Sequence, residues 1–206
     1  MLTNERSDYK EFITLLVGPE SSPTTFIVHK EAATARSKFI SAACSSNWIE
    51  GQSKTIKLPE EKPDYIQAYI HWLYTNSVNL AILGQCISPR KWEEHIKLYL
   101  LANRLDDIRL RNMIINMIVD IDTDVSGKLP SYKSVTLAYD GTHDGAPLRK
   151  LLVSLFFARL SRDEITNVVN HVPKAFLEDL ICKTFVLLPA TTWERFKEGR
   201  AEYQEG

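Results

Sequence analysis

The chain has few cysteines, and this shortage excludes a disulfide-stabilised protein. Cys44, Cys86 and Cys182 are the only cysteines among 206 residues, and no two of them form a Cys-x-x-Cys pair. An odd number of scattered cysteines predicts free thiols in a reducing compartment. The N-terminus also lacks a basic start followed by an apolar core, so we expect no signal peptide. We therefore expect an intracellular protein, in the cytoplasm or the nucleus.

Charge of one sign and long apolar runs are also lacking, which argues against two kinds of partner. Lys and Arg number 25 against 26 Asp and Glu, a formal net charge of −1. A general nucleic-acid binder needs excess positive charge to displace phosphate counterions, so we expect no nucleic acid. The longest apolar stretch, residues 151–160, is interrupted by Arg159. It is shorter than the roughly 18–20 residues of a spanning helix, so we expect no membrane partner.

The usual motifs for catalysis and ligand binding are absent too. There is no Gly-x-x-x-x-Gly-Lys-Ser/Thr loop, Gly-x-Gly-x-x-Gly run, Gly-x-Ser-x-Gly turn or His-Glu-x-x-His pair. Residues 140–145 begin like a calcium loop, but Leu151 stands where that loop needs its bidentate Glu. The spacing of His71, Cys86 and His95 does not suggest zinc. We expect no enzyme, no catalytic residue, no metal and no cofactor.

What is present is a cluster of predicted strands at the N-terminal end, followed by helices. Residues 12–18 and 24–29 are β-rich runs separated by turn formers at 19–23, which predicts a hairpin. Residues 30–44 predict two short helices, and residues 54–58 alternate as in a half-buried strand. This order differs from a βαβα alternation. It predicts an α+β fold, with a small N-terminal sheet covered by helices.

Capping residues predict the limits of the helices that follow. Pro63 is well placed as a first helical residue, and Asn76 as a left-handed C-cap. Asp106 or Asp107 is expected to cap a later helix. These signals predict consecutive helices after the sheet.

The C-terminal part is predicted to be all helical. Residues 120–130 have the composition of a linker. Beyond it, one helix carries a wide apolar face: Leu148, Leu151, Leu152, Leu155 and Phe156. We expect these side chains to be buried in a helical bundle, because five exposed ones would cost more than most domains' net stability.

A series of short motifs connects the N-terminal part to a known family. In chain order they are Phe26-Ile27-Val28 running into His29-Lys30, Ser37-Lys38-Phe39, Trp48-Ile49-Glu50-Gly51-Gln52, Thr55-Ile56-Lys57-Leu58-Pro59 and Ile70-His71-Trp72-Leu73-Tyr74-Thr75. In this order and spacing they resemble the BTB/POZ domain, and the helical remainder is similar to the extension of many fungal BTB proteins. The resemblance implies a BTB/POZ-like domain at residues 8–120, a helical extension at 131–190 and a charged tail at 191–206.

The resemblance implies a non-enzymatic protein–protein interaction module that forms a homodimer and presents a surface to a partner protein. That module would be an adaptor for a cullin-type ubiquitin ligase, or an oligomerising scaffold without a ligase. In cullin-binding relatives a loop carries a hydrophobic residue, any residue and Glu, and Trp48, Ile49 and Glu50 stand at the matching place. They are the candidate partner-binding residues. Alternatively, Trp48 folds over the sheet and Glu50 caps a turn.

Two alternatives lie outside this class. One is an enzyme or ligand-binding protein that uses the C-terminal helices. The other is a transcriptional regulator, which would need a DNA-binding region that these residues do not contain.

The sequence departs from the family at two positions. Many dimeric BTB proteins have Asp just before the first strand and Arg two residues before the His, whereas this chain has Phe12 and Ile27. The departure weakens any analogy to corepressor binding. It also leaves dimerisation dependent on hydrophobic surface alone.

Several matched residues have a structural interpretation. His29 stands where a strand meets a helix, and its imidazole is expected to bond backbone groups at that junction. Thr75 is expected to bond a carbonyl in the last turn of its helix. Helical spacing predicts that four side chains belong to the core: Phe39, Trp72, Leu73 and Tyr74.

Overall fold

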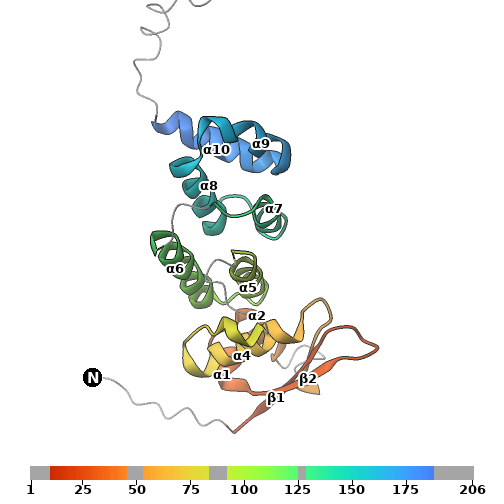
Figure 1. Ribbon diagram of the computed structural model, residues 1–206. Coiled ribbons are helices and arrows are strands. Elements are labelled where there is room, and N and C mark those ends of the chain that lie inside the picture. The colour runs from red at the N-terminus through yellow and green to blue at the C-terminus, as the bar shows by residue number, and fades with distance from the viewer. Residues whose placement is uncertain (1–9, 46–52, 84–91, 125–128, 188–206) are drawn as a thin grey trace, which may run out of the picture. The chain divides into compact units, whose positions relative to one another are not determined.

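The computed structural model describes four stretches of the chain: residues 10–45, 53–83, 92–124 and 129–187. The chain divides into two compact units, Met1–Lys128 and Leu129–Gly206. Within the described stretches, the first unit holds a three-stranded sheet with helices and the second holds helices alone (Figure 1). The predicted α+β class is confirmed. No helix in these stretches has the length and apolarity to cross a bilayer.

The first unit contains the predicted hairpin, two short helices, third strand and long helices. Its elements are β1 (Phe12–Val17), β2 (Thr24–His29), α1 (Lys30–Thr34), α2 (Lys38–Ala43), β3 (Thr55–Leu58), α4 (Pro63–Thr75), the short 3-10 helix η1 (Leu80–Leu83), α5 (Trp92–Arg104) and α6 (Ile108–Asp124). The linker predicted at 120–130 was placed too early, because α6 continues to Asp124. Ile114 and Ile118 are buried one helical turn apart and keep the core-facing spacing of α6 up to the predicted start of the linker.

The sheet is built around β1. Strand β2 pairs with it antiparallel and β3 pairs with it parallel on the other side, so that the order is β2-β1-β3. Leu15 lies opposite Phe26 on one side and Ile56 on the other. Alternate side chains of β1 (Ile13, Leu15 and Val17) are buried on one face of the sheet, over which α1, α2 and α4 lie (Figure 1). The opposite face lacks this cover and carries the more exposed side chains of the strands.

Helix α4 follows its predicted limits. Pro63 occupies its first turn, and Asn76 ends it with a left-handed φ of 54°. The Thr75 hydroxyl donates to the His71 carbonyl at 2.8 Å, as expected. Local capping therefore defines this helix at both ends.

Two of the four predicted core side chains are in the core and two are not. Trp72 and Leu73 of α4 are buried, but Tyr74 is 48% exposed and Phe39 of α2 is 41% exposed. Successive residues of a helix are turned about 100° from each other, so Tyr74 points away from the side on which its two neighbours are buried. In the short helix α2 the residue after Phe39, Ile40, takes the core position instead.

A buried carboxylate ties the helices of the first unit together. Asp107, which is fully buried, accepts a hydrogen bond from the Leu110 amide at 2.9 Å and so caps α6, as predicted. It also accepts one from the Trp72 indole Nε1 at 3.0 Å. The buried Ser37 hydroxyl, at the start of α2, donates to the Leu105 carbonyl at 2.5 Å. The turn between α5 and α6 is thereby joined to both α2 and α4.

The buried phenol of Tyr69 gives the first unit a dependence on alkaline pH. Its burial and the nearby Asp107 carboxylate raise the pKa of Tyr69 above its ordinary value. Below about pH 10 the folded and unfolded chains both keep this proton. Above it only the unfolded chain releases the proton, so the free energy of unfolding should fall by up to about 1.4 kcal/mol per pH unit. Urea unfolding between about pH 9 and about pH 11 measures this slope.

Tyr69→Phe is the control for this prediction. The variant removes the phenol and should show a smaller loss of stability over the same pH range. An unchanged slope would mean that Tyr69 ionises equally in both states.

The second unit is a set of helices around an aromatic centre. Its elements are α7 (Tyr132–Asp140), α8 (Pro147–Arg159), the short 3-10 helix η2 (Arg162–Glu164), α9 (Ile165–His171) and α10 (Lys174–Leu187). The predicted apolar face of α8 is buried at four positions and half-buried at Leu151. Phe176 of α10 makes edge contacts with Phe156 and Tyr139, with ring centroids 5.0 and 5.6 Å apart. The predicted tail at 191–206 lies outside the described residues.

The loop that begins like a calcium site is organised by an arginine. Arg149 is buried and its Nε donates to the Thr142 hydroxyl at 3.0 Å. Its guanidinium also donates to the Tyr139 carbonyl at 2.8 Å and to Asp144 at 2.5 Å. It lies over the Tyr139 ring, 4.4 Å from the centroid. Thr142 and Asp144 of this loop thus share the arginine of α8 with the Tyr139 carbonyl of α7, so the arginine links the loop and α7 to α8.

Candidate interaction surface

The predicted partner-binding residues Trp48, Ile49 and Glu50 lie outside the described residues, as does Cys86. Their role stays a prediction. Within the described parts of the chain, no three His, Cys, Asp or Glu side chains are grouped so that they could hold a metal ion. The surface with the clearest binding chemistry is instead the uncovered side of the sheet.

We call this side the open face. Strand alternation and register assign eight residues to it: Phe12, Thr14, Leu16, Thr25, Ile27, His29, Thr55 and Lys57. Ile27 is 68% exposed, the highest value for any large apolar side chain in the described residues, and Phe12 is 50% exposed. Both stand at positions where the BTB/POZ pattern that the sequence resembles carries charges. The open face therefore exposes large apolar side chains on two neighbouring strands.

One end of the open face is organised by an aromatic group. The His29 ring lies against Phe12, with centroids 4.6 Å apart, and edge-on to Tyr74 of α4. The Tyr74 hydroxyl accepts the backbone N–H of His29 at 3.1 Å and is hydrogen-bonded to the ring Nδ1 of the same residue at 2.9 Å. The junction between β2 and α1 thus has its amide satisfied by a tyrosine side chain, a partner that the sequence did not suggest.

The start of β1 is held by charges next to this aromatic group. The ammonium group of Lys30 lies 3.0 Å from the Glu11 carboxylate, and that of Lys54 lies 3.8 Å from it. The hydrogen bond from Lys30, with the charge of both lysines, keeps the pKa of Glu11 below its ordinary value. These pairs lie at the surface, where ion pairs contribute little to stability, so their effect is to orient the strand.

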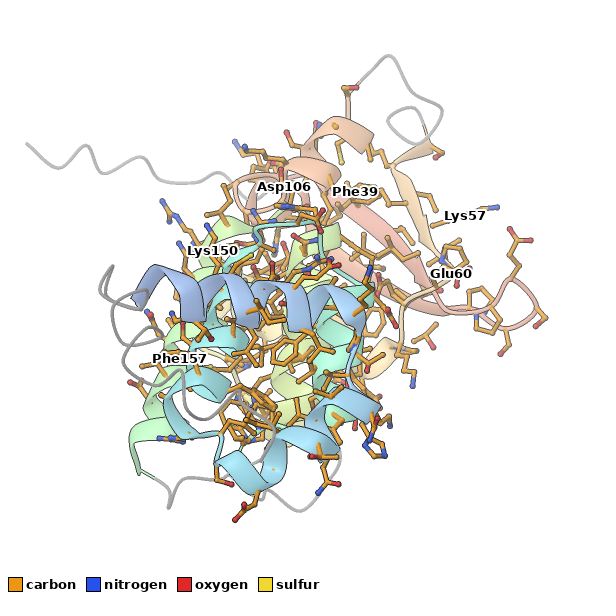
Figure 2. All side chains as sticks on the ribbon, turned by 90° about the horizontal axis from the view of Figure 1, so that it is seen from above. Phe39, Lys57, Glu60, Asp106, Lys150 and Phe157 are labelled. Carbon is orange, nitrogen blue, oxygen red and sulfur yellow. The ribbon has the colours of Figure 1, made fainter. Side chains whose placement is uncertain are left out.

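The other end of the open face contains a hollow of about 290 Å³. It is lined by Leu16, Gly18, Glu20, Pro23, Lys57 and Pro59. Gly18 has a φ of 90°, which a residue with a side chain rarely adopts, and it ends β1 there. Lys57 and Glu20 form an ion pair at 3.5 Å, and the Lys57 side chain extends away from the sheet (Figure 2). The lining thus combines the apolar side chains of Leu16, Pro23 and Pro59 with the Lys57–Glu20 ion pair.

The arrangement suits the burial of apolar surface against another protein. Fully burying one large apolar side chain contributes about 1.5–3 kcal/mol, and the open face offers two that are at least half exposed. Clustered exposed apolar side chains of this kind mark interfaces more often than isolated ones. No family model matches the chain, and no curated protein matches it.

Proposed function

We propose that this chain is a non-enzymatic protein–protein interaction module of the BTB/POZ type, which self-associates and presents a further surface to a partner protein. The observation that carries the proposal is the open face, where Phe12 and Ile27 are exposed at the positions that are charged in many dimeric relatives. The order of the elements supports the proposal: two strands, two short helices, a strand and a long helix. The family-like motifs within the described residues fall on these elements in the same order. An intracellular location belongs to the same proposal.

Self-association is tested by light scattering of the full chain over a concentration series from about 1 to about 500 μM, a range that spans ordinary dimer affinities. The wild type is expected to approach twice the monomer mass. Ile27→Ser should weaken the association at least about tenfold, since each copy loses the burial of one large side chain.

Ile181→Ser is the matched control. Ile181 lies in α10 of the second unit and is 55% exposed, so this variant makes the same chemical change away from the open face. Its association should equal that of the wild type. A wild type that stays monomeric throughout the series would contradict self-association.

The cullin role is proposed on the sequence motif at Trp48 to Glu50. Its test is binding of the purified chain to a cullin N-terminal domain, with Trp48→Ala and Glu50→Ala as probes. Loss of about 2 kcal/mol or more on Trp48→Ala, with the fold retained, is the result expected of an interface anchor. Absence of binding at high micromolar concentration would favour an oligomerising scaffold without a ligase.

A further inference from the structure

Among the described residues, nothing pairs with the outward backbone groups of two residues on the outer edge of β2. The Thr14 amide donates to the Lys54 carbonyl at 2.8 Å, which shows that the even-numbered residues of β1 direct their amides toward β3. The odd-numbered residues therefore face β2, and they pair there with Thr24, Phe26 and Val28. Thr25, Ile27 and His29 direct their amides and carbonyls away from the sheet. The bond from the His29 amide to Tyr74 agrees with this assignment.

This edge lacks the usual protection against pairing. Natural edge strands are blunted by lysine, by proline within the strand, by bulges or by short length. Strand β2 has six residues, carries neither lysine nor proline, and pairs with β1 in an unbroken register. The described residues offer no hydrogen-bond partner to the outward groups of Thr25 and Ile27.

We propose that two copies of the chain pair through the outer edges of their β2 strands, antiparallel about a two-fold axis at Phe26, to form one continuous six-stranded sheet. The inference rests on the proposed self-association and names its interface. In this register Thr25 of each copy lies opposite Ile27 of the other. Both residues direct their backbone groups outward, so the two pairs form four hydrogen bonds.

The occupant is a second copy because the strand complements itself in this register. Strand β2 contains no Lys, Arg, Asp or Glu, so two copies bring no like charges together. His29, whose amide already bonds Tyr74, falls opposite Pro23, which has no amide to offer. Phe26 meets its own copy in a non-hydrogen-bonded pair, where cross-strand side chains lie closest. The open faces of the two copies then become continuous.

The test removes one outward amide while keeping the side-chain surface. Thr25→Pro deletes a hydrogen-bond donor that faces away from β1, a place where edge strands accept proline. Two of the four intermolecular hydrogen bonds are lost, one from each copy, and each loss weakens the association roughly fivefold. Light scattering should therefore show an association weakened about 25-fold. Thr25→Val, which keeps the amide and the branched side chain, should associate like the wild type. Circular dichroism and thermal unfolding check that both variants are folded.

Amide hydrogen exchange of the wild type provides a second measurement that needs no variant. The Phe26 amide bonds within the sheet and should be protected at every concentration. The Thr25 and Ile27 amides should exchange freely in dilute protein and at least about tenfold more slowly when the dimer forms.

The outcomes separate this inference from the proposed function. A dimer that survives in folded Thr25→Pro but weakens in Ile27→Ser would overturn edge pairing and leave self-association through the open face. Free exchange of the Thr25 and Ile27 amides in the dimer would also overturn edge pairing. The edge of β2 would then be available for pairing with an extended segment of another protein. A wild type that stays monomeric would overturn both proposals.

Discussion

Replacing Asp107 with alanine is expected to lower the free energy of unfolding of the first unit by about 3 kcal/mol. The carboxylate is fully buried, caps α6 and accepts the Trp72 indole N–H, so the substitution leaves two buried donors without an acceptor. Loss of a cap costs about 1 kcal/mol, and loss of a hydrogen bond to a charged group costs about 1.5–3 kcal/mol. Urea unfolding followed by tryptophan fluorescence measures the change, because Trp72 itself is one reporter.

Asp106→Asn is the matched control for Asp107→Ala. Asp106 is the neighbouring residue, its side chain is partly exposed, and it has a φ of 49°, which asparagine tolerates. Its ion pairs with Lys38 and Arg111 are exposed or half-exposed, so their loss should cost less than about 1 kcal/mol. Asp107→Asn, which keeps one carbonyl oxygen, should lie between these two variants. An Asp107→Ala variant as stable as Asp106→Asn would contradict the anchoring role.

Replacing Arg149 with methionine is expected to destabilise the second unit by about 3–5 kcal/mol. The guanidinium is buried and joins the Thr142 hydroxyl and the Tyr139 carbonyl while lying over the Tyr139 ring. Methionine fills much of the apolar volume of the arginine stem. It leaves the buried hydroxyl and carbonyl without a hydrogen-bond donor, and unpaired buried polar groups are costly. Hydrogen exchange of the α7 and α8 amides, read as a free energy of opening, localises the effect to this unit.

Two substitutions next to this site sharpen the test. Lys150→Met makes a similar change at the next residue, whose side chain is exposed, and should leave the amide exchange nearly unchanged. Arg149→Lys should not rescue the unit, because an ammonium cannot bond a hydroxyl and a carbonyl in the planar fork geometry of arginine. Rescue by lysine would show that the positive charge, and not the fork, holds the loop.

The candidate surface was partly predictable from the sequence. Strand alternation places Phe12 and Ile27 with the polar residues of β1 and β2, and the two positions are also those at which the sequence departs from the BTB/POZ pattern that it resembles. Tyr74 was misassigned to the core. Periodicity shows which residues share a side of a helix, but it does not show how far around the helix the buried side extends. Phe39 was misassigned because α2 is too short for periodicity to locate its buried side.

Local interactions explain what the sequence alone determined. The hairpin, the two short helices and the limits of α4 follow from turn formers, β-branched runs and the caps Pro63 and Asn76, each of which acts within a few residues. The acidic cap of α6 was foreseen for the same reason, as one of two adjacent aspartates. These features do not depend on which distant segments meet.

Tertiary structure alone decided which strand lies at the free edge. Strand β3 was foreseen as a strand, but its sequence does not say whether it joins β1 or β2, or in which direction. It joins β1 in parallel, and this pairing buries Ile56 and Leu58 beside Leu15 and Val17. Because that gain comes from contacts between residues some forty positions apart, no local pattern encodes it. The same pairing leaves the outward amides of Thr25 and Ile27 without a hydrogen-bond partner among the described residues, and so creates the edge on which the proposed dimer depends.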